Sequence, residues 1–153
     1  MLIPIWQKFI GILIYILPWS DAIPFGRYLF MDLPYLQWLA MPAIPILLIE
    51  QILPFGSLLL FFVLFLAVAR NPKVPYFLRF NTLQALLIDI AIVLINYAFK
   101  ILIEPLGAGL LVSTLSSTVL IAILAIVIFA IGECLQGKEP DLPGISEAVR
   151  MQL

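Results

Sequence analysis

The sequence predicts an all-α, polytopic membrane protein with four transmembrane helices and one additional Pro-rich interfacial or re-entrant segment. Three observations predict this class: 64% of the 153 residues are hydrophobic, only 11% are charged, and long apolar runs are separated by short breaks containing proline and charge. A soluble domain is roughly half apolar and about a quarter charged. A chain this short could not bury the excess apolar surface, so a lipid bilayer is the expected solvent.

The same composition argues against several functional classes. The net charge is −1, histidine is absent, and Cys134 is the single cysteine. This charge gives no electrostatic reason to expect nucleic acid as a partner. One cysteine can form neither a disulfide within the chain nor a cysteine cluster for a metal, and the absence of histidine removes His-based catalysis, haem ligation and most zinc sites. We therefore expect no cofactor, no metal site and no enzymatic activity.

The first predicted span is residues 3–17, within "MLIPIWQKFIGILIYILPW", and Pro18 is expected to end it. Trp, Pro and Asp follow this apolar run, whereas a secretory signal would end in a small-residue cleavage site. We therefore interpret it as a retained membrane anchor. An Arg- and Ser-rich transit peptide is also not found, which favours a protein made in the compartment that it serves.

Residues 34–50, "PYLQWLAMPAIPILLIE", form the Pro-rich segment. They are apolar enough to enter lipid, but Pro42 and Pro45 would leave backbone groups unsatisfied in hydrocarbon. Tyr35 and Trp38 are residue types typical of the membrane interface. We predict an interfacial or re-entrant segment, and a fifth full span is the alternative.

The other three predicted spans approach the length of about 20 apolar residues that a bilayer requires. The first begins at Pro54, where a missing N–H costs nothing in the first helical turn. The second contains Asp89 and Lys100, and the third carries no charge. These spans are residues 54–69, 82–103 and 110–131.

Basic residues predict the orientation. With four spans, both termini, the tail 133–153 and the loop around residues 70–80 lie on one side of the membrane. Basic loops remain cytoplasmic, so both termini are predicted to face the cytoplasm or the plastid stroma, and the loop residues Arg70, Lys73 and Arg79 are predicted to set the topology. The basic residues on this side are Lys8, Arg70, Lys73, Arg79, Lys138 and Arg150, against Arg27 and Lys100 on the other.

A polar stripe is predicted on the span 82–103. Thr82, Asp89 and Asn96 are spaced by seven residues and Lys100 follows by four, which places them on one helical face. Such a stripe points towards protein or water rather than lipid. On the next span, small hydroxylated residues are the candidates to pack against it, because they allow close helix approach and cross-helix hydrogen bonds. These are Ser113, Ser117 and Thr118.

Asp89 is the central candidate of the stripe, because an ionisable group inside a membrane is a functional hypothesis by default. The predicted spans place no charge at its depth, and Lys100 lies about 16 Å away along the helix. We therefore expect Asp89 to be protonated or to face a hydrated cleft. Two roles remain open for the stripe, which are helix docking and part of a conduction path.

Three stretches resemble a known family: "LPWSDAIPFGRYLF", "PFGSLLLFFVLFLAVARNPKVPYFLRFNTLQALLIDI" and "PDLPGISEA". They are similar to the twenty-kilodalton subunit family of the chloroplast inner-envelope protein translocon, and most similar to its cyanobacterial and plastid-encoded relatives. The resemblance runs from about residue 15 to 148, with its most specific part from Arg70 to Asp89, where Leu83 replaces a methionine of the family pattern.

The resemblance implies a four-helix membrane protein with both termini inside, acting as a central subunit of a multi-subunit protein translocon. The implied partners are the lipid bilayer, other translocon subunits or further copies of the chain, and the translocating polypeptide. The implied location is a cyanobacterial plasma membrane or a plastid inner envelope. A non-conducting membrane scaffold or assembly factor remains an alternative, as does a small-solute transporter subunit in a cyanobacterium.

Overall fold

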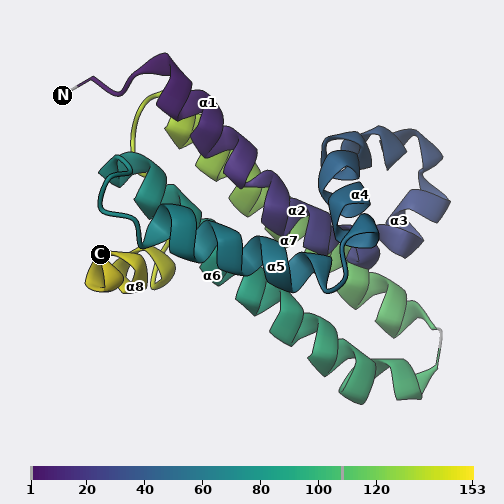
Figure 1. Cartoon of the computed structure of the whole chain (residues 1–153). Coiled ribbons are helices and arrows are strands. Elements are labelled where there is room, and N and C mark those ends of the chain that lie inside the picture. Colours follow the sequence, from purple (N-terminus) through teal and green to yellow (C-terminus); the bar gives the residue numbers. More distant parts are fainter. Residues whose placement is uncertain (1, 108) are drawn as a thin grey trace.

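The computed structural model describes residues 2–107 and 109–153, and every regular element in these ranges is helical (Figure 1). The all-α prediction is confirmed. The elements are α1 (Ile5–Ile14), α2 (Ile16–Ala22), η1 (Ile23–Gly26), α3 (Arg27–Asp32), η2 (Pro34–Ala43), α4 (Ile44–Ile52), α5 (Gly56–Leu64), η3 (Phe65–Ala69), α6 (Tyr76–Ala98), η4 (Phe99–Ile103), η5 (Glu104–Leu106), α7 (Leu110–Leu135) and α8 (Ile145–Gln152).

Four helical stretches of the described residues are long and apolar enough to cross a membrane, which confirms the four-helix membrane class. Their identity differs in part from the predicted set, because the Pro-rich segment is among them and Gly56–Ala69 is shorter. Which segments cross the bilayer stays a prediction. The four stretches are Ile5–Asp32, Pro34–Ile52, Tyr76–Leu106 and Leu110–Leu135.

The first stretch continues beyond residue 17 to Asp32, although the sequence predicted that Pro18 would end it. Pro18 lies in the first turn of α2, where its missing N–H is tolerated, so helical structure continues past it. A further proline, Pro24, opens the 3₁₀ segment η1. The 28 residues of this stretch extend over about 42 Å if they are fully helical.

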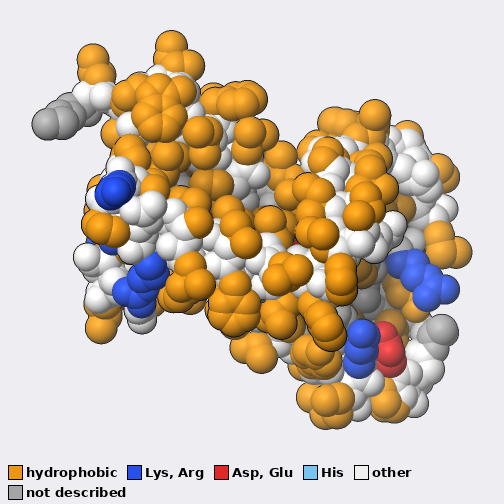
Figure 2. All heavy atoms as spheres, viewed as in Figure 1, with side chains coloured by type: hydrophobic (Ala, Val, Ile, Leu, Met, Phe, Trp, Pro, Cys, Tyr) orange, Lys and Arg blue, Asp and Glu red, His pale blue; other side chains and the backbone are white. Residues whose placement is uncertain are grey.

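The core lies where α6 packs against α1 and α2, and where α7 packs against the same two helices and α3 (Figure 1). Large side chains such as Tyr15, Ile92 and Leu120 are almost completely buried there. Outside this core, apolar side chains cover most of the visible surface, and the basic side chains gather at the two ends (Figure 2). An apolar outer surface is the arrangement expected of a protein surrounded by lipid or by partner helices.

The α4–α5 connection is a tight turn that brings two helices into backbone contact. A Cβ on Gly56 would lie 2.5 Å from the Cα of Glu50, so only glycine fits. Phe55, in the turn, has a φ of 54°, in the left-handed region. Because Glu50 lies beside Asp89 of α6, the turn is level with the middle of that helix. Whether this segment re-enters the membrane, lies in the interface or forms a further full span stays a prediction.

Both termini lie at the same end of the helix bundle as the 70–75 connection (Figure 1). Gly137 lies against the side chains of Ile3 and Lys8, and Arg70 donates hydrogen bonds to Gln152. The connection between η5 and α7 lies at the opposite end (Figure 1). The arrangement fits the predicted layout, while the membrane face that each end occupies stays a prediction.

Candidate functional site

The predicted polar stripe on α6 runs from the protein interior towards the far end of the bundle. Thr82 is fully buried, Asp89 is 7% exposed, and Asn96 is half-buried. Lys100, in the π-helical segment η4, is exposed. The first three side chains therefore face protein rather than lipid. Their functional role stays a prediction.

Asp89 lies beside two other carboxyl groups, those of Asp21 on α2 and Glu50 on α4. The Asp89 carboxyl is within hydrogen-bonding reach of Asp21, and Glu50 is close enough to act electrostatically on both. The buried oxygens Asp89 Oδ1 and Glu50 Oε1 have no hydrogen-bond donor. Carboxyl groups held in contact share a proton or are hydrated. We call Asp21, Glu50 and Asp89 the acidic triad.

The described residues contain no group of side chains arranged to hold a metal ion. Their two ion pairs both belong to Arg150, so no cation is paired with the triad. Sequence reasoning missed the triad because it ended the first span before Asp21 and placed Glu50 at the membrane surface. The continuation of the first helix past Pro18 brings Asp21 to the depth of Asp89.

The face of α7 that points into the bundle is not the face that was predicted to pack against the stripe, but the one next to it. Its buried hydroxyl is that of Ser116, whereas Ser113 and Ser117 are only half-buried. Thr118 is exposed, and its hydroxyl donates to the Thr114 carbonyl oxygen of the same helix. Because α7 is apolar on all sides, the sequence contains no signal for which face is buried. A docking role for Ser113, Ser117 and Thr118 stays a prediction.

A buried hydrogen-bond network joins Tyr15, between α1 and α2, to α6 and to the chain after α7. The Tyr15 hydroxyl donates to Asn81 Oδ1 over 2.8 Å, and Asn81 Nδ2 donates to the Phe77 carbonyl oxygen over 2.8 Å. Gln84 Nε2 lies 3.1 Å from the Tyr15 hydroxyl oxygen and 3.0 Å from the Pro140 carbonyl oxygen. Tyr15, Asn81 and Gln84 are all fully buried, so each lost bond would leave a desolvated polar group.

Ser146 completes this network from the carboxyl-terminal tail. Its hydroxyl oxygen accepts from the Leu142 backbone N–H over 2.7 Å and contacts Gln84 Oε1 and the Pro140 carbonyl oxygen. We call these interactions of Tyr15, Asn81, Gln84 and Ser146 the tail-docking network. It connects "RFNTLQA" of α6 with "PDLPGISEA" of the tail, two of the stretches that carry the family resemblance.

The basic loop contributes to the same docking. Arg70 donates to the Gln152 carbonyl oxygen over 3.2 Å and to its side-chain oxygen over 2.9 Å. Arg79 Nε donates to the Ala69 carbonyl oxygen over 3.1 Å, which satisfies the end of η3. From the tail, the Arg150 guanidinium lies 5.3 Å from the centre of the Phe80 ring. The sequence predicted Arg70 and Arg79 only as topology signals and gave no sign of these contacts.

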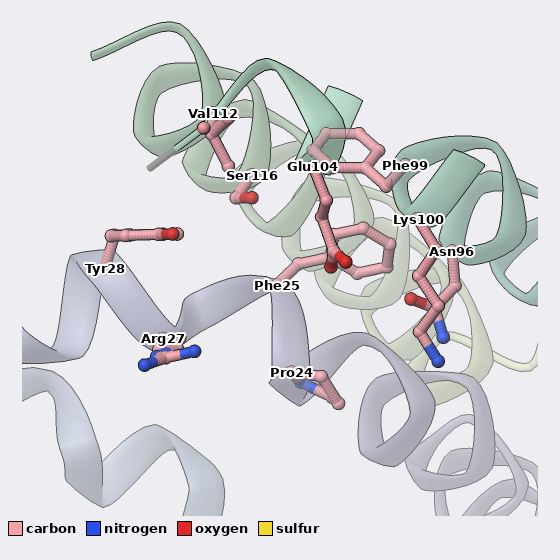
Figure 3. A pocket seen from close by; sticks show the side chains of 11 residues that line it. Pro24, Phe25, Arg27, Tyr28, Asn96, Phe99, Lys100, Glu104, Val112 and Ser116 are labelled. Carbon is pink, nitrogen blue, oxygen red and sulfur yellow. The ribbon is translucent and has the colours of Figure 1, made fainter. Parts of the chain in front are cut away.

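A pocket of about 590 Å³ opens at the other end of the bundle, between η1, the end of α6 and the start of α7 (Figure 3). Asn96 and Lys100 of the stripe line one side, and Arg27 lies on the other. Ser116 also lines it, so the pocket brings together Asn96 and the inward hydroxyl of α7. The stripe therefore connects the acidic triad in the middle of α6 with a basic pocket at its end.

Comparison with known proteins shows similarity along nearly the whole chain. Residues 4–149 match the family described as "Chloroplast import apparatus Tic20-like". The chain is 37% identical to a "Tic20 family protein" of Synechocystis, over 96% of this chain and 92% of that one. It is 31% identical to "Protein TIC 20-v, chloroplastic" of Arabidopsis thaliana, over 96% and 71% of the two chains. A "Tic20 family protein Ycf60" of Gracilaria tenuistipitata is 28% identical, over 94% of this chain and 73% of that one.

Proposed function

Because the chain belongs to the Tic20-like family, we propose that it is a membrane-embedded subunit of a protein translocon. The observation that carries the proposal is that the match covers residues 4–149 and includes relatives named as chloroplast proteins. Its proposed partners are the lipid bilayer, other translocon subunits or further copies of the chain, and the translocating polypeptide. We propose no catalytic role.

The packed interior supports a path for the polypeptide at the surface of the subunit rather than through it. Around Asn81 and Gln84, the interior of the bundle is filled by buried side chains. On the outside, α4 and α5 expose large apolar side chains such as Leu48, Leu58 and Phe62. An exposed apolar face of this kind suits contact with partner helices as well as with lipid. A path shared with a second subunit is therefore part of the proposal.

We also propose that the bundle end with both termini faces the cytoplasm of a cyanobacterium or the stroma of a plastid. The membrane would be the plasma membrane or the inner envelope. The support is the excess of basic residues at that end, among them Arg70, Lys73 and Arg79.

Purification in mild detergent tests the translocon proposal. A polypeptide stalled during translocation should cross-link to the chain, and other membrane subunits should co-purify with it. A photoreactive residue at Phe62 on α5 should give this adduct more strongly than one at Ile128 on α7, if the exposed face of α5 adjoins the path. Recovery of the chain alone, without adducts, together with unchanged translocation after its depletion, would refute the proposal.

A non-conducting scaffold or assembly factor is favoured by one observation, which is that Thr82 at the start of the stripe is fully buried. Cysteine substitutions at Thr82, Asp89 and Asn96 separate the two functions when they are tested with a water-soluble thiol reagent. Labelling of all three in the working translocon supports a hydrated path. Protection of all three supports a scaffold in which the stripe only packs helices.

A further inference from the structure

The pocket at the far end of the bundle has an unusual combination of charge and apolar surface. Arg27 and Lys100 both line it, and neither forms an ion pair within the described chain. Phe25 and Phe99 pack edge to face with their ring centres 5.3 Å apart and form its apolar wall. Glu104 is its acidic member, so the lining carries a net positive charge of one.

The polar groups of the pocket come from α3, α6, η4, η5 and α7 and line one space. Arg27 and Tyr28 lie on one side of it in Figure 3, and Asn96 and Lys100 on the other. The carboxylate of Glu104 projects between them. Lys100 belongs to the π-helical segment η4, a helix type that is rare and often occurs at functional sites. Two separated cations with donors and acceptors between them match a polar ligand that carries one negative charge.

The position of the pocket favours a ligand that belongs to the membrane. It lies beside the connection between η5 and α7, at the end of two stretches that are long enough to span a bilayer. This is the depth of lipid headgroups. The same helices expose apolar side chains, for example Leu94, Ile101 and Leu111, on which acyl chains can lie. Basic pockets between transmembrane helices are a known way of holding anionic headgroups.

We propose that this pocket binds the headgroup of an anionic lipid whose phosphate or sulfonate group is attached to a hydroxylated glycerol or sugar. Arg27 and Lys100 form charge-assisted hydrogen bonds to the anion. Glu104, Asn96 and Ser116 bind the hydroxyl groups, for which a carboxylate is a strong acceptor. The presence of Glu104 thus distinguishes a hydroxylated headgroup from a bare phosphate.

The test is lipid binding to the full-length protein in a neutral detergent, measured by native mass spectrometry with the melting temperature in parallel. The probes are phosphatidylglycerol, phosphatidic acid, phosphatidylcholine and soluble glycerol phosphate. Phosphatidylglycerol should bind at least about tenfold more tightly than phosphatidylcholine, because both carry the phosphate but only phosphatidylglycerol offers hydroxyl groups to Glu104 and lacks a choline cation that Arg27 and Lys100 repel. It should also exceed phosphatidic acid and raise the melting temperature. Equal binding of all lipids would overturn the proposal.

Two sets of variants locate the site. The double variant Arg27→Gln/Lys100→Gln should lose about tenfold or more in phosphatidylglycerol affinity. The matched control Lys73→Gln/Lys138→Gln removes the same charge from exposed positions at the opposite end and should bind as the unchanged protein does. Equal loss in the two double variants would show non-specific attraction and overturn the site.

A third variant and the soluble probe test the chemistry of recognition. Glu104→Gln should bind phosphatidic acid more tightly and lose the preference for phosphatidylglycerol, because the repelling carboxylate is gone. An unchanged preference in Glu104→Gln would contradict the assigned role of this residue. Glycerol phosphate should bind far more weakly than the lipid, since it lacks acyl chains. If glycerol phosphate bound as tightly as the lipid, the ligand would be a soluble phosphate ester, and the proposal of a lipid ligand would be overturned.

Discussion

Ser146 shows how much of this fold depends on single polar side chains. Its hydroxyl links the backbone of the tail to Gln84 of α6, and both residues are fully buried. In a chain that is mostly apolar, burial of side chains alone does not determine which tail conformation is adopted. A buried hydrogen bond can specify it, because the alternative leaves unsatisfied groups.

Ser146→Ala should therefore release the tail. The change leaves Gln84 Oε1 and the Leu142 N–H without partners, which should cost about 1–3 kcal/mol. We expect a lower melting temperature in detergent and faster proteolysis after Leu135. Ser57→Ala, at an exposed position, is the matched control and should change neither. Unaltered proteolysis in Ser146→Ala would show that the network does not hold the tail.

Asp89→Asn should have a mild effect on stability. The amide has nearly the same size as the carboxyl, and its N–H can donate to Asp21, which lies within hydrogen-bonding reach. We expect a change below about 1 kcal/mol and normal levels of assembled protein. The measurements are the melting temperature and the amount of protein in membranes, with exposed Asp32→Asn as the control. Severe loss of assembled protein would indicate that the charge itself is required.

At the scale of the elements, the packing of α4 against α5 depends on Gly56, because only a residue without a Cβ fits at this position. Gly56→Ala would place a Cβ 2.5 Å from the Glu50 Cα, and neither backbone can yield cheaply. Overpacking of this kind costs about 1–3 kcal/mol. Gly132→Ala on α7 is the control, because its Cβ would meet nothing within 4 Å. Melting temperatures should fall for Gly56→Ala alone, and equal values would contradict the close approach of α4 and α5.

The elements also show what the sequence could predict. The spacing of Thr82, Asp89 and Asn96 predicted an inward stripe on α6, and the structure places these three side chains towards protein. The acidic triad was not predictable, because it depends on the path of the chain between Pro18 and Glu50. Several prolines in that region can break, bend or merely begin a helix, and local sequence does not decide among these outcomes.

The tail-docking network was missed for a related reason. The long-range bonds of the network join residues 56 to 69 positions apart, such as Gln84 with Pro140 and with Tyr15. Periodicity describes one helix at a time and carries no signal for such pairs. The clue available in the sequence was that "RFNTLQA" and "PDLPGISEA" both belong to the family resemblance, which marks the two stretches but not the contact between them.

At the scale of the whole molecule, the network, the basic loop and the pocket divide the bundle into two unlike ends. One end holds both termini, tied together by contacts such as those of Gly137 with Lys8 and of Arg70 with Gln152. The other end holds the pocket with Arg27 and Lys100. Figure 2 shows basic side chains at both ends and an apolar surface between them. We therefore expect the membrane to lie between these two ends.

Sidedness in sealed vesicles tests this central claim most directly. Tags on the two termini should be removed by an added protease in the same vesicle population. A Gly109→Cys variant, in the connection before α7 where a Cβ meets nothing within 4 Å, should react with an impermeant thiol reagent only from the opposite face. Native Cys134 is buried and serves as an internal negative control. Tags reachable from opposite faces would contradict the layout, and with it the placement of the stripe and the pocket.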